Sequence, residues 1–241
     1  MFILILGLEE FQEKLGYKFK DISYLELAFT HTTYVFEHKG QHYESNQRLE
    51  FVGDGVLDCV VGSEIYKRKP YVDEGYLSKT RSLIVCEKSL AKVARQLDMG
   101  KLLLLGKGEA FTGGHDKDST LADAFESVVA AVYFDGGYRE AERIVMKNLQ
   151  ETIELALAGK IFLDYKSRLL EIAQEKNNQH VITFEIVNER GPAHMREFDA
   201  EVYADGIFLS RATGKSKKDA EQNAAKDAID KYLQLFEKDK Q

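Results

Sequence analysis

The sequence predicts two domains, an all-α domain followed by a smaller α+β domain with the order helix, three strands, helix. From Leu8 to Leu157 apolar residues recur at three- and four-residue spacing, which is typical of amphipathic helices. After Asp164 short alternating segments are separated by turn residues, which is typical of antiparallel strands. The expected boundaries are 1–157 for the all-α domain, 158–163 for a short linker and 164–237 for the α+β domain.

The helical pattern of the first domain is clearest in Gly75–Leu97 and Leu121–Phe134. Gly136-Gly137 predicts the end of the second segment, because glycine is favoured just after a helix. The apolar start, Met1–Leu6, is too short to cross a membrane, which requires about 20 residues. It also lacks the basic start and cleavage site of a signal peptide. We interpret it as a short buried strand or as the start of a helix.

The helical pattern weakens around Ala156–Lys160, where Gly159 is a candidate hinge. The end of a helix within one continuous domain would also explain this glycine. The change of pattern that follows favours a linker.

The elements of the second domain follow from alternation and turn chemistry. Asp205-Gly206 predicts a two-residue hairpin, since both central positions of such a turn need positive φ. Ser216-x-x-Asp219 predicts a capping box at the start of the last helix. The expected elements are a helix over 164–176, strands over 181–187, 198–203 and 207–212, and a helix over 216–235. The side chains expected to face inward are Ile182, Phe184 and Ile186 on the first strand and Phe198, Ala200 and Val202 on the second.

The composition, with 44% hydrophobic and 30% charged residues, is that of an ordinary soluble globular protein. Cys59 and Cys86 are isolated, which argues against a zinc site or a disulfide framework and fits the reducing cytoplasm. The net charge is −7, and residues 164–241 hold 13 Lys/Arg and 15 Asp/Glu, a net of −2. Any surface that binds a nucleic acid must therefore be a local basic patch.

Two pairs of carboxylates mark the first domain. Glu50 and Asp54 would lie one turn apart on a helix, and Asp123 and Glu126 are three residues apart on another. If the two pairs converge in the folded protein, they form a site with only oxygen ligands, which suits Mg²⁺ or Mn²⁺. Taken singly, the first pair is equally explained by an exposed helix face, and Thr120-x-x-Asp123 by a capping box.

The stretch Asn46–Asp54 resembles the signature of the ribonuclease III family, and Thr120–Glu126 resembles the second acidic motif of that family. The order of elements after Asp164 resembles the double-stranded RNA-binding domain, so the resemblance covers nearly the whole chain. It implies an all-α ribonuclease III endonuclease domain followed by an α+β (α-β-β-β-α) RNA-binding domain. Mg²⁺ is the implied cofactor, with Mn²⁺ as a substitute.

The resemblance also implies roles for individual residues. The metal ligands would be Glu50, Asp54, Asp123 and Glu126, and among them Asp54 and Glu126 would be the catalytically most sensitive. Glu74 matches an accessory acidic position, and Gln47 stands where many family members carry glutamate. Glutamine keeps hydrogen-bonding capacity and loses the charge. The resemblance implies that this position lies near the RNA strand and outside the innermost metal ligands, so the departure bears on cleavage efficiency and site choice more than on activity itself.

Other residues of the two motifs have expected structural roles. Gly53 and Gly55 each cost a helix about 1 kcal/mol relative to alanine, which predicts that a backbone, a metal or a partner approaches closely. Phe51 is a core residue by default, but the resemblance implies that it plugs a cavity in the partner of a homodimer. Asp58 is expected to face solvent or an interface, and His31 to be structural.

The second candidate site is basic. Lys215, Lys217 and Lys218 cluster at the start of the last helix, where they oppose the helix dipole unless phosphates dock there. An ordinary solvated charge run is the alternative. The resemblance implies RNA contacts by these lysines, by Glu171 on the first helix of the domain and by His194, which would reach 2′-hydroxyl groups. Leu170 stands where many relatives carry glutamine, which weakens any inference about sequence preference. Because A-form RNA is read mainly by shape, only a modest preference is expected.

The expected function is an Mg²⁺-dependent endoribonuclease that cleaves double-stranded RNA and processes ribosomal and messenger RNA precursors. The resemblance implies products with 5′-phosphate and 3′-hydroxyl ends and a short 3′ overhang. We expect neither a membrane nor a small-molecule cofactor. A non-catalytic RNA-binding protein with the same fold is the alternative, with Gln47 as its support. A DNA nuclease is disfavoured, because the second domain is of a type that reads A-form geometry.

Overall fold

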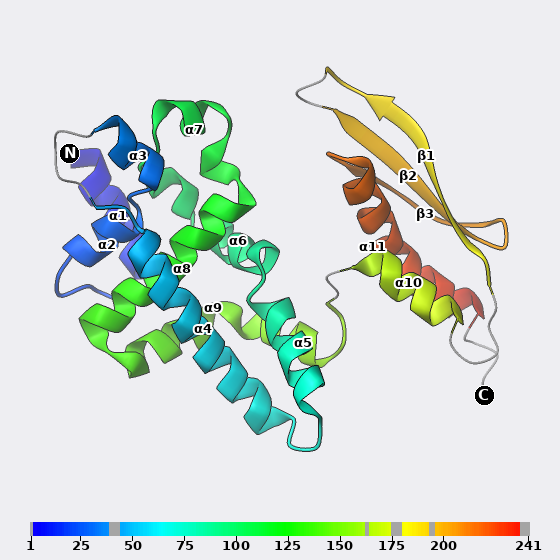
Figure 1. The fold of residues 1–241 in the computed structure, drawn as a ribbon, viewed down its shortest axis with the longest axis horizontal. Coiled ribbons are helices and arrows are strands. Elements are labelled where there is room, and N and C mark those ends of the chain that lie inside the picture. Colours follow the sequence, from blue (N-terminus) through cyan, green and yellow to red (C-terminus); the bar gives the residue numbers. More distant parts are fainter. Residues whose placement is uncertain (1, 39–43, 162–163, 175–179, 193–195, 237–241) are drawn as a thin grey trace. The chain divides into compact units, whose positions relative to one another are not determined.

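The computed structural model describes residues 2–38, 44–161, 164–174, 180–192 and 196–236 (Figure 1). The chain separates into two compact units, Met1–Ile161 and Phe162–Gln241. The predicted fold class, an all-α domain followed by an α+β domain, is confirmed. The finer boundary, with 158–163 as a linker, stays a prediction.

The first unit is built from helices. Within its described residues the strand-like pairing is an isolated bridge between Thr30 and Leu104. None of the helices that the structure describes is long and apolar enough to span a membrane. The elements are α1 (Phe2–Leu15), α2 (Ser23–Ala28), α3 (Thr32–Glu37), α4 (Gln47–Arg68), α5 (Glu74–Ile84), α6 (Glu87–Gln96), η1 (Met99–Leu102), α7 (Lys107–Phe111), η2 (Gly114–Asp116), α8 (Asp118–Gly136) and α9 (Tyr138–Leu157).

Of the two interpretations of the apolar start of the chain, the start of a helix is confirmed, since α1 begins at Phe2. The segment Gly75–Leu97 divides into α5 and α6 at Cys86, whose backbone is extended (φ −69°, ψ 154°). There the Ser89 hydroxyl donates to the carbonyl of Leu83 at 2.9 Å, which stabilises the turn between the helices. Apolar spacing alone does not reveal such a break.

Helix α8 forms the centre of the first core and contacts α2, α4, α6 and α9 (Figure 1). From Thr120 to Val132 every residue is buried except Asp123 and Glu126. A helix that is apolar on nearly all sides must be surrounded by other elements. The helix ends where predicted, because Gly137 adopts a positive φ of 84°.

Helix α4 approaches the backbone of α8 closely. A Cβ atom added to Gly53 would lie 1.9 Å from the carbonyl oxygen of Glu126. The predicted reason for Gly53, a nearby backbone, is therefore confirmed. At Gly55 no other atom of the described chain would lie within 4 Å of an added Cβ, so its reason is not found within one chain.

The second unit is a three-stranded antiparallel sheet in the order β1-β2-β3, covered by two helices. Its elements are α10 (Tyr165–Gln174), β1 (Ile182–Arg190), β2 (Glu197–Ala204), β3 (Ile207–Gly214) and α11 (Lys217–Phe236). The predicted hairpin is confirmed, with φ of 48° at Asp205 and 81° at Gly206. β1 runs further than expected, because an irregularity between Ile186 and Asn188 interrupts the alternation without ending the strand.

The core of the second unit lies between the sheet and the helices, and the residues expected to face inward do so. Ala220, Ala224, Ala225 and Ala228 of α11 are fully buried, since small side chains let the helix lie close to the sheet. The capping box is present in a modified form. Ser216 Oγ accepts from the Asp219 N–H at 3.1 Å, while the Asp219 carboxylate accepts from the Lys215 N–H at 3.0 Å.

The close approach of α4 and α8 predicts unequal effects of alanine at two glycines of α4. Gly53→Ala is expected to destabilise the protein by about 1–3 kcal/mol, because the methyl group overlaps a backbone oxygen. Gly62→Ala is the matched control, since its Cβ would make an ordinary 3.8 Å contact with Arg81, and it is expected to stabilise by about 0.5–1 kcal/mol. Urea unfolding of both variants measures the difference. Equal stability would contradict the close approach.

Candidate metal centre and RNA-binding surface

Three carboxylates from two helices converge on one point of the first unit. Oxygen atoms of Glu50 on α4 and of Asp123 and Glu126 on α8 lie within 4.8 Å of one another. All three side chains are half-buried. None of the three carboxylates has a hydrogen bond or an ion pair with any residue in the described part of the chain. We call these three residues the acidic cluster.

The electrostatics of the acidic cluster are unfavourable without a cation. Burial, followed by the charges of Asp54, Asp123 and Glu50, raises the pKa of Glu126 to about 8. Burial and then Asp123 and Asp54 raise the pKa of Glu50. Burial also raises the pKa of Asp123, although His31 acts in the opposite direction. Two charges about 5 Å apart repel by about 3 kcal/mol at an effective dielectric constant of about 20.

The donor set fits a hard divalent cation. Carboxylate oxygens are the ligands that Mg²⁺ and Mn²⁺ prefer, and Mg²⁺ is held by a few carboxylates together with water. A bound cation would neutralise the repulsion and restore the charged form of all three groups. The alternative in which Thr120 caps a helix is wrong, because α8 begins at Asp118 and Thr120 is buried inside it.

The other predicted residues of this site lie outside the acidic cluster. Asp54 is exposed on the next turn of α4, near enough to raise the pKa of Glu50 and Glu126. Gln47 is exposed at the first position of α4. Glu74 begins α5, beyond the opposite end of α4, which is 22 residues or about 33 Å long. One chain therefore does not bring Glu74 to the acidic cluster.

The remaining motif residues have clear local surroundings. Phe51 is 82% exposed, so it is not a core residue of this chain. Asp58 forms an ion pair with Arg81 at 3.4 Å. His31 caps α3, where its Nδ1 accepts from the Thr33 N–H at 3.3 Å, and this is a structural role as expected.

The basic cluster of the second unit lies at the start of α11. Lys215, Lys217 and Lys218 are exposed. None of the three forms an ion pair with a residue whose position is described. The Lys217 ammonium lies 5.9 Å from the centre of the Phe198 ring. The structure thus places three exposed ammonium groups without ion-pair partners at a helix N-terminus, the end of a helix that favours anions.

Of the two further predicted RNA contacts, Glu171 and His194, the structure describes only Glu171. Glu171 on α10 is exposed, and its carboxylate lies 3.3 Å from Arg168 Nη1. Leu170, beside it, is half-buried. His194 lies outside the described residues.

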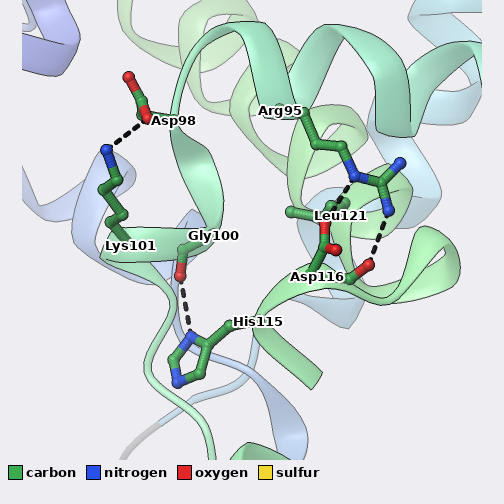
Figure 2. A pocket seen from close by; sticks show the side chains of 7 residues that line it. All are labelled: Arg95, Asp98, Gly100, Lys101, His115, Asp116 and Leu121. Carbon is green, nitrogen blue, oxygen red and sulfur yellow. Dashed lines mark hydrogen bonds and ion pairs between the residues drawn. The ribbon is translucent and has the colours of Figure 1, made fainter. Parts of the chain in front are cut away.

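A separate pocket of about 520 Å³ lies among α6, η1, η2 and α8. Figure 2 shows that its charged side chains pair with one another. Arg95 binds Asp116 at 2.6 Å, and Lys101 binds Asp98 at 2.5 Å. His115 Nδ1 lies 2.8 Å from the carbonyl oxygen of Gly100. The pocket contains no member of the acidic cluster, and its Arg and Lys side chains form ion pairs with its Asp side chains.

Sequence reasoning missed two kinds of buried polar residue. Asn46 and Ser127, next to the acidic cluster, are 1% and 0% exposed. Asp199 on β2 is 3% exposed on the sheet face opposite the helices, where Arg211 at 2.8 Å and Thr213 at 2.7 Å bind its carboxylate and hold its pKa at about 2. The available signal is their place in the sequence, since Asn46 is the first residue of the Asn46–Asp54 motif and Ser127 directly follows the second motif.

Comparisons with known proteins give two family matches and close relatives. Residues 21–153 match the model described as Ribonuclease-III-like, and residues 165–232 match the double-stranded RNA binding motif. A ribonuclease 3 from Pelotomaculum thermopropionicum is 43% identical over 218 residues, which cover 90% of each chain.

Solved structures agree with the first match. The nuclease domain of ribonuclease III from Campylobacter jejuni has a TM-score of 0.55 and 36% identity, and the match covers 60% of this chain and 94% of that domain. A second structure of the same domain is described as flexible in the region involved in dimer formation. It has a TM-score of 0.54 and 37% identity, with 59% of this chain and 99% of that domain covered.

The raised pKa of Glu126 predicts a pH-dependent gain in stability from Glu126→Gln in metal-free protein. A carboxyl with a folded-state pKa above its unfolded value binds more protons when folded, so its contribution to stability declines as pH rises from 4.5 to about 8. The variant, which cannot ionise, is expected to have a higher Tm than the parent near pH 8.5 and a similar Tm near pH 4.5.

Thermal unfolding across this pH range checks the expectation. Glu151→Gln, at an exposed position of α9, is the control and should show no such trend. A Tm difference for Glu126→Gln that is constant with pH would contradict the shifted pKa.

Proposed function

Because this chain belongs to the ribonuclease III family and is an endoribonuclease, we propose that it hydrolyses double-stranded RNA with Mg²⁺ as its cofactor. The observation that carries the proposal is the acidic cluster, in which three half-buried carboxylates without a cationic partner among the described residues lie within 4.8 Å of one another. Such an arrangement is stable in its charged form when a cation binds between the groups. Mn²⁺ is expected to substitute for Mg²⁺.

The proposed roles of the residues follow from their placement. Glu50, Asp123 and Glu126 would hold the cation, which supplies Lewis acidity and a nucleophilic water at neutral pH. Asp54 is exposed beside the acidic cluster, so its carboxylate can accept a hydrogen bond from the attacking water and orient it. The water oxygen bonds to phosphorus and the bond to the 3′ oxygen breaks, which gives 5′-phosphate and 3′-hydroxyl ends.

The second unit would bind the duplex. The exposed ammonium groups of Lys215, Lys217 and Lys218 can contact phosphates across the groove of A-form RNA. Glu171 and His194 are proposed as groove contacts. A chain with a net charge of −7 can bind RNA in this way, because the three lysines concentrate positive charge at the surface where phosphates would dock.

We propose that the protein acts as a homodimer through α4. Phe51, Gly55, Cys59 and Tyr66 form an exposed stripe on this helix, with Phe51 82% and Tyr66 70% exposed. A two-fold axis across α4 would place the two copies of the helix antiparallel. Glu74 of each subunit would then approach the acidic cluster of the other, and the two sites would cut opposite strands to leave a short 3′ overhang.

A non-catalytic RNA-binding protein is the second candidate, and Gln47 is the observation that favours it. Gln47 lies outside the acidic cluster, so the missing charge does not remove one of the three converging ligands. We therefore rank this candidate second.

For the endoribonuclease, the proposed biological role is processing of ribosomal and messenger RNA precursors in the cytoplasm.

The proposed chemistry predicts that Glu126→Gln abolishes cleavage and leaves RNA binding intact. Replacing even a hydrogen-bond partner of a metal ligand costs roughly 10–100-fold, so loss of a ligand is expected to cost at least about 100-fold in rate. Digestion of a long RNA duplex with Mg²⁺ or with chelator measures this, and Glu151→Gln serves as the control. Binding without Mg²⁺- or Mn²⁺-dependent cutting by the unaltered protein would favour the non-catalytic candidate.

The basic cluster predicts a defined change in salt dependence. Replacing Lys215, Lys217 and Lys218 by alanine is expected to weaken duplex binding for all sequences. The slope of log K against log salt should become shallower by about 1 for each phosphate that the protein no longer touches. Lys231→Ala, near the other end of α11, is the matched control. Filter binding between low and physiological salt gives the slopes. An unchanged slope would show that the lysines are an ordinary solvated charge run.

A further inference from the structure

We infer that Asn46 and Ser127 form a buried hydrogen-bonded contact that holds the carboxylates of α4 in register with those of α8. We call this contact the Asn46–Ser127 lock and assign both residues a positioning role for the acidic cluster. The inference rests on the proposed metal-dependent function, because it concerns how the same site keeps its geometry.

Asn46 is the fixed point of the lock. It immediately precedes α4 and is 1% exposed. Its backbone N–H donates to the carbonyl of Thr30 at 2.8 Å, and its Nδ2 donates to the carbonyl of Ala28 at 3.3 Å. Its own carbonyl accepts from the Glu50 N–H at 2.9 Å. The side chain thus ties the first turn of α4, including Glu50, to the end of α2.

Ser127 completes the lock from α8. Its side chain is fully buried, and its hydroxyl lies 2.7 Å from the carbonyl oxygen of Asp123 and 3.3 Å from that of Asn46. A hydroxyl has one hydrogen to donate, so the two carbonyls share it in a three-centre bond with Asp123 as the nearer acceptor. Ser127 follows Glu126 directly and its hydroxyl contacts the backbone of Asp123. The bond from this hydroxyl to Asn46 therefore fixes the start of α4 relative to both α8 ligands.

The lock and the Gly53 contact are two separate points that fix α4 against α8. The first joins Asn46 to Ser127, and the second brings Gly53 against the carbonyl oxygen of Glu126. On α4 the ligand Glu50 lies between them, one turn from each. Two contacts at different points along a helix fix both its position along its axis and its rotation about that axis relative to the neighbouring helix.

A hydrogen bond suits this position better than an apolar contact. Apolar side chains pack with little directional preference, whereas a buried polar group that loses its hydrogen-bond partner destabilises the structure. The residues of α8 that directly follow Ser127 are apolar, so after sliding or rotation of α4 they offer no replacement for the bond between Ser127 and the Asn46 carbonyl. The buried Asn46 amide would also lose its acceptor at Ala28. Mg²⁺ requires ligand oxygens at about 2.0–2.1 Å in near-octahedral geometry, so small displacements of Glu50 weaken binding.

Ser127→Ala is the direct test, because it removes the shared hydroxyl and leaves the volume almost unchanged. Titration of the full-length protein with Mn²⁺ in the absence of RNA, followed by electron paramagnetic resonance, measures metal affinity independently of activity. We expect metal affinity to fall roughly 10–100-fold, as for other groups that orient metal ligands. Cleavage should recover as Mg²⁺ is raised, whereas duplex affinity should stay unchanged. Asn46→Ala, which removes the bond to Ala28, is a second variant with the same expectation.

Ser210→Ala is the matched control. Ser210 is a buried serine of the second unit whose hydroxyl donates to the carbonyl of Ala224 at 2.6 Å. Its loss should lower the Tm and leave Mn²⁺ affinity unchanged, which separates loss of a buried hydrogen bond from loss of positioning. Cleavage by the unaltered protein together with normal Mn²⁺ affinity of Ser127→Ala and Asn46→Ala would overturn the lock alone. Absence of Mn²⁺ binding by the unaltered protein would overturn the metal site itself and the lock with it.

Discussion

The contact between α4 and α8 is the constraint on which the rest of the first unit depends. Gly53 lets the two helices approach until a Cβ atom would lie 1.9 Å from the carbonyl oxygen of Glu126. Any other residue at that position would push α4 outward and carry Glu50 away from Asp123 and Glu126. The glycine costs the helix about 1 kcal/mol in propensity, and it permits a site shared between two helices.

The charged form of the acidic cluster is unfavourable in the folded protein, and a bound cation would stabilise it. Between Thr120 and Val132 every residue of α8 except Asp123 and Glu126 is buried, so these two carboxylates lie on a stretch of helix that otherwise belongs to the core. Burial raises the pKa of both carboxyls, and repulsion from Asp54, Asp123 and Glu50 adds to the shift of Glu126, whose pKa rises to about 8. The free energy stored in this repulsion becomes available for cation binding, since only a positive charge between the groups restores their charged forms without loss of stability.

The two units concentrate charge of opposite sign at their candidate sites. The first unit concentrates negative charge in the acidic cluster, where a divalent cation would bind under the proposed function. The second unit presents Lys215, Lys217 and Lys218 at a helix N-terminus, although residues 164–241 carry a net charge of −2. Several acidic groups of that unit are paired internally, as Asp199 is with Arg211 at 2.8 Å. Local placement rather than net charge therefore decides which surface can meet RNA.

The sequence by itself determined the order of the two folds, the Asp205-Gly206 hairpin and the carboxylate pairs, because these depend on periodicity and turn chemistry within short segments. It did not show that Glu50 joins the α8 pair while Asp54 stays exposed, that α5 and α6 separate at Cys86, or that Asn46 meets Ser127. Only the tertiary structure decided these points. Helical spacing fixes which side chains share a face, whereas the height and rotation of one helix against another depend on contacts between residues far apart in the chain.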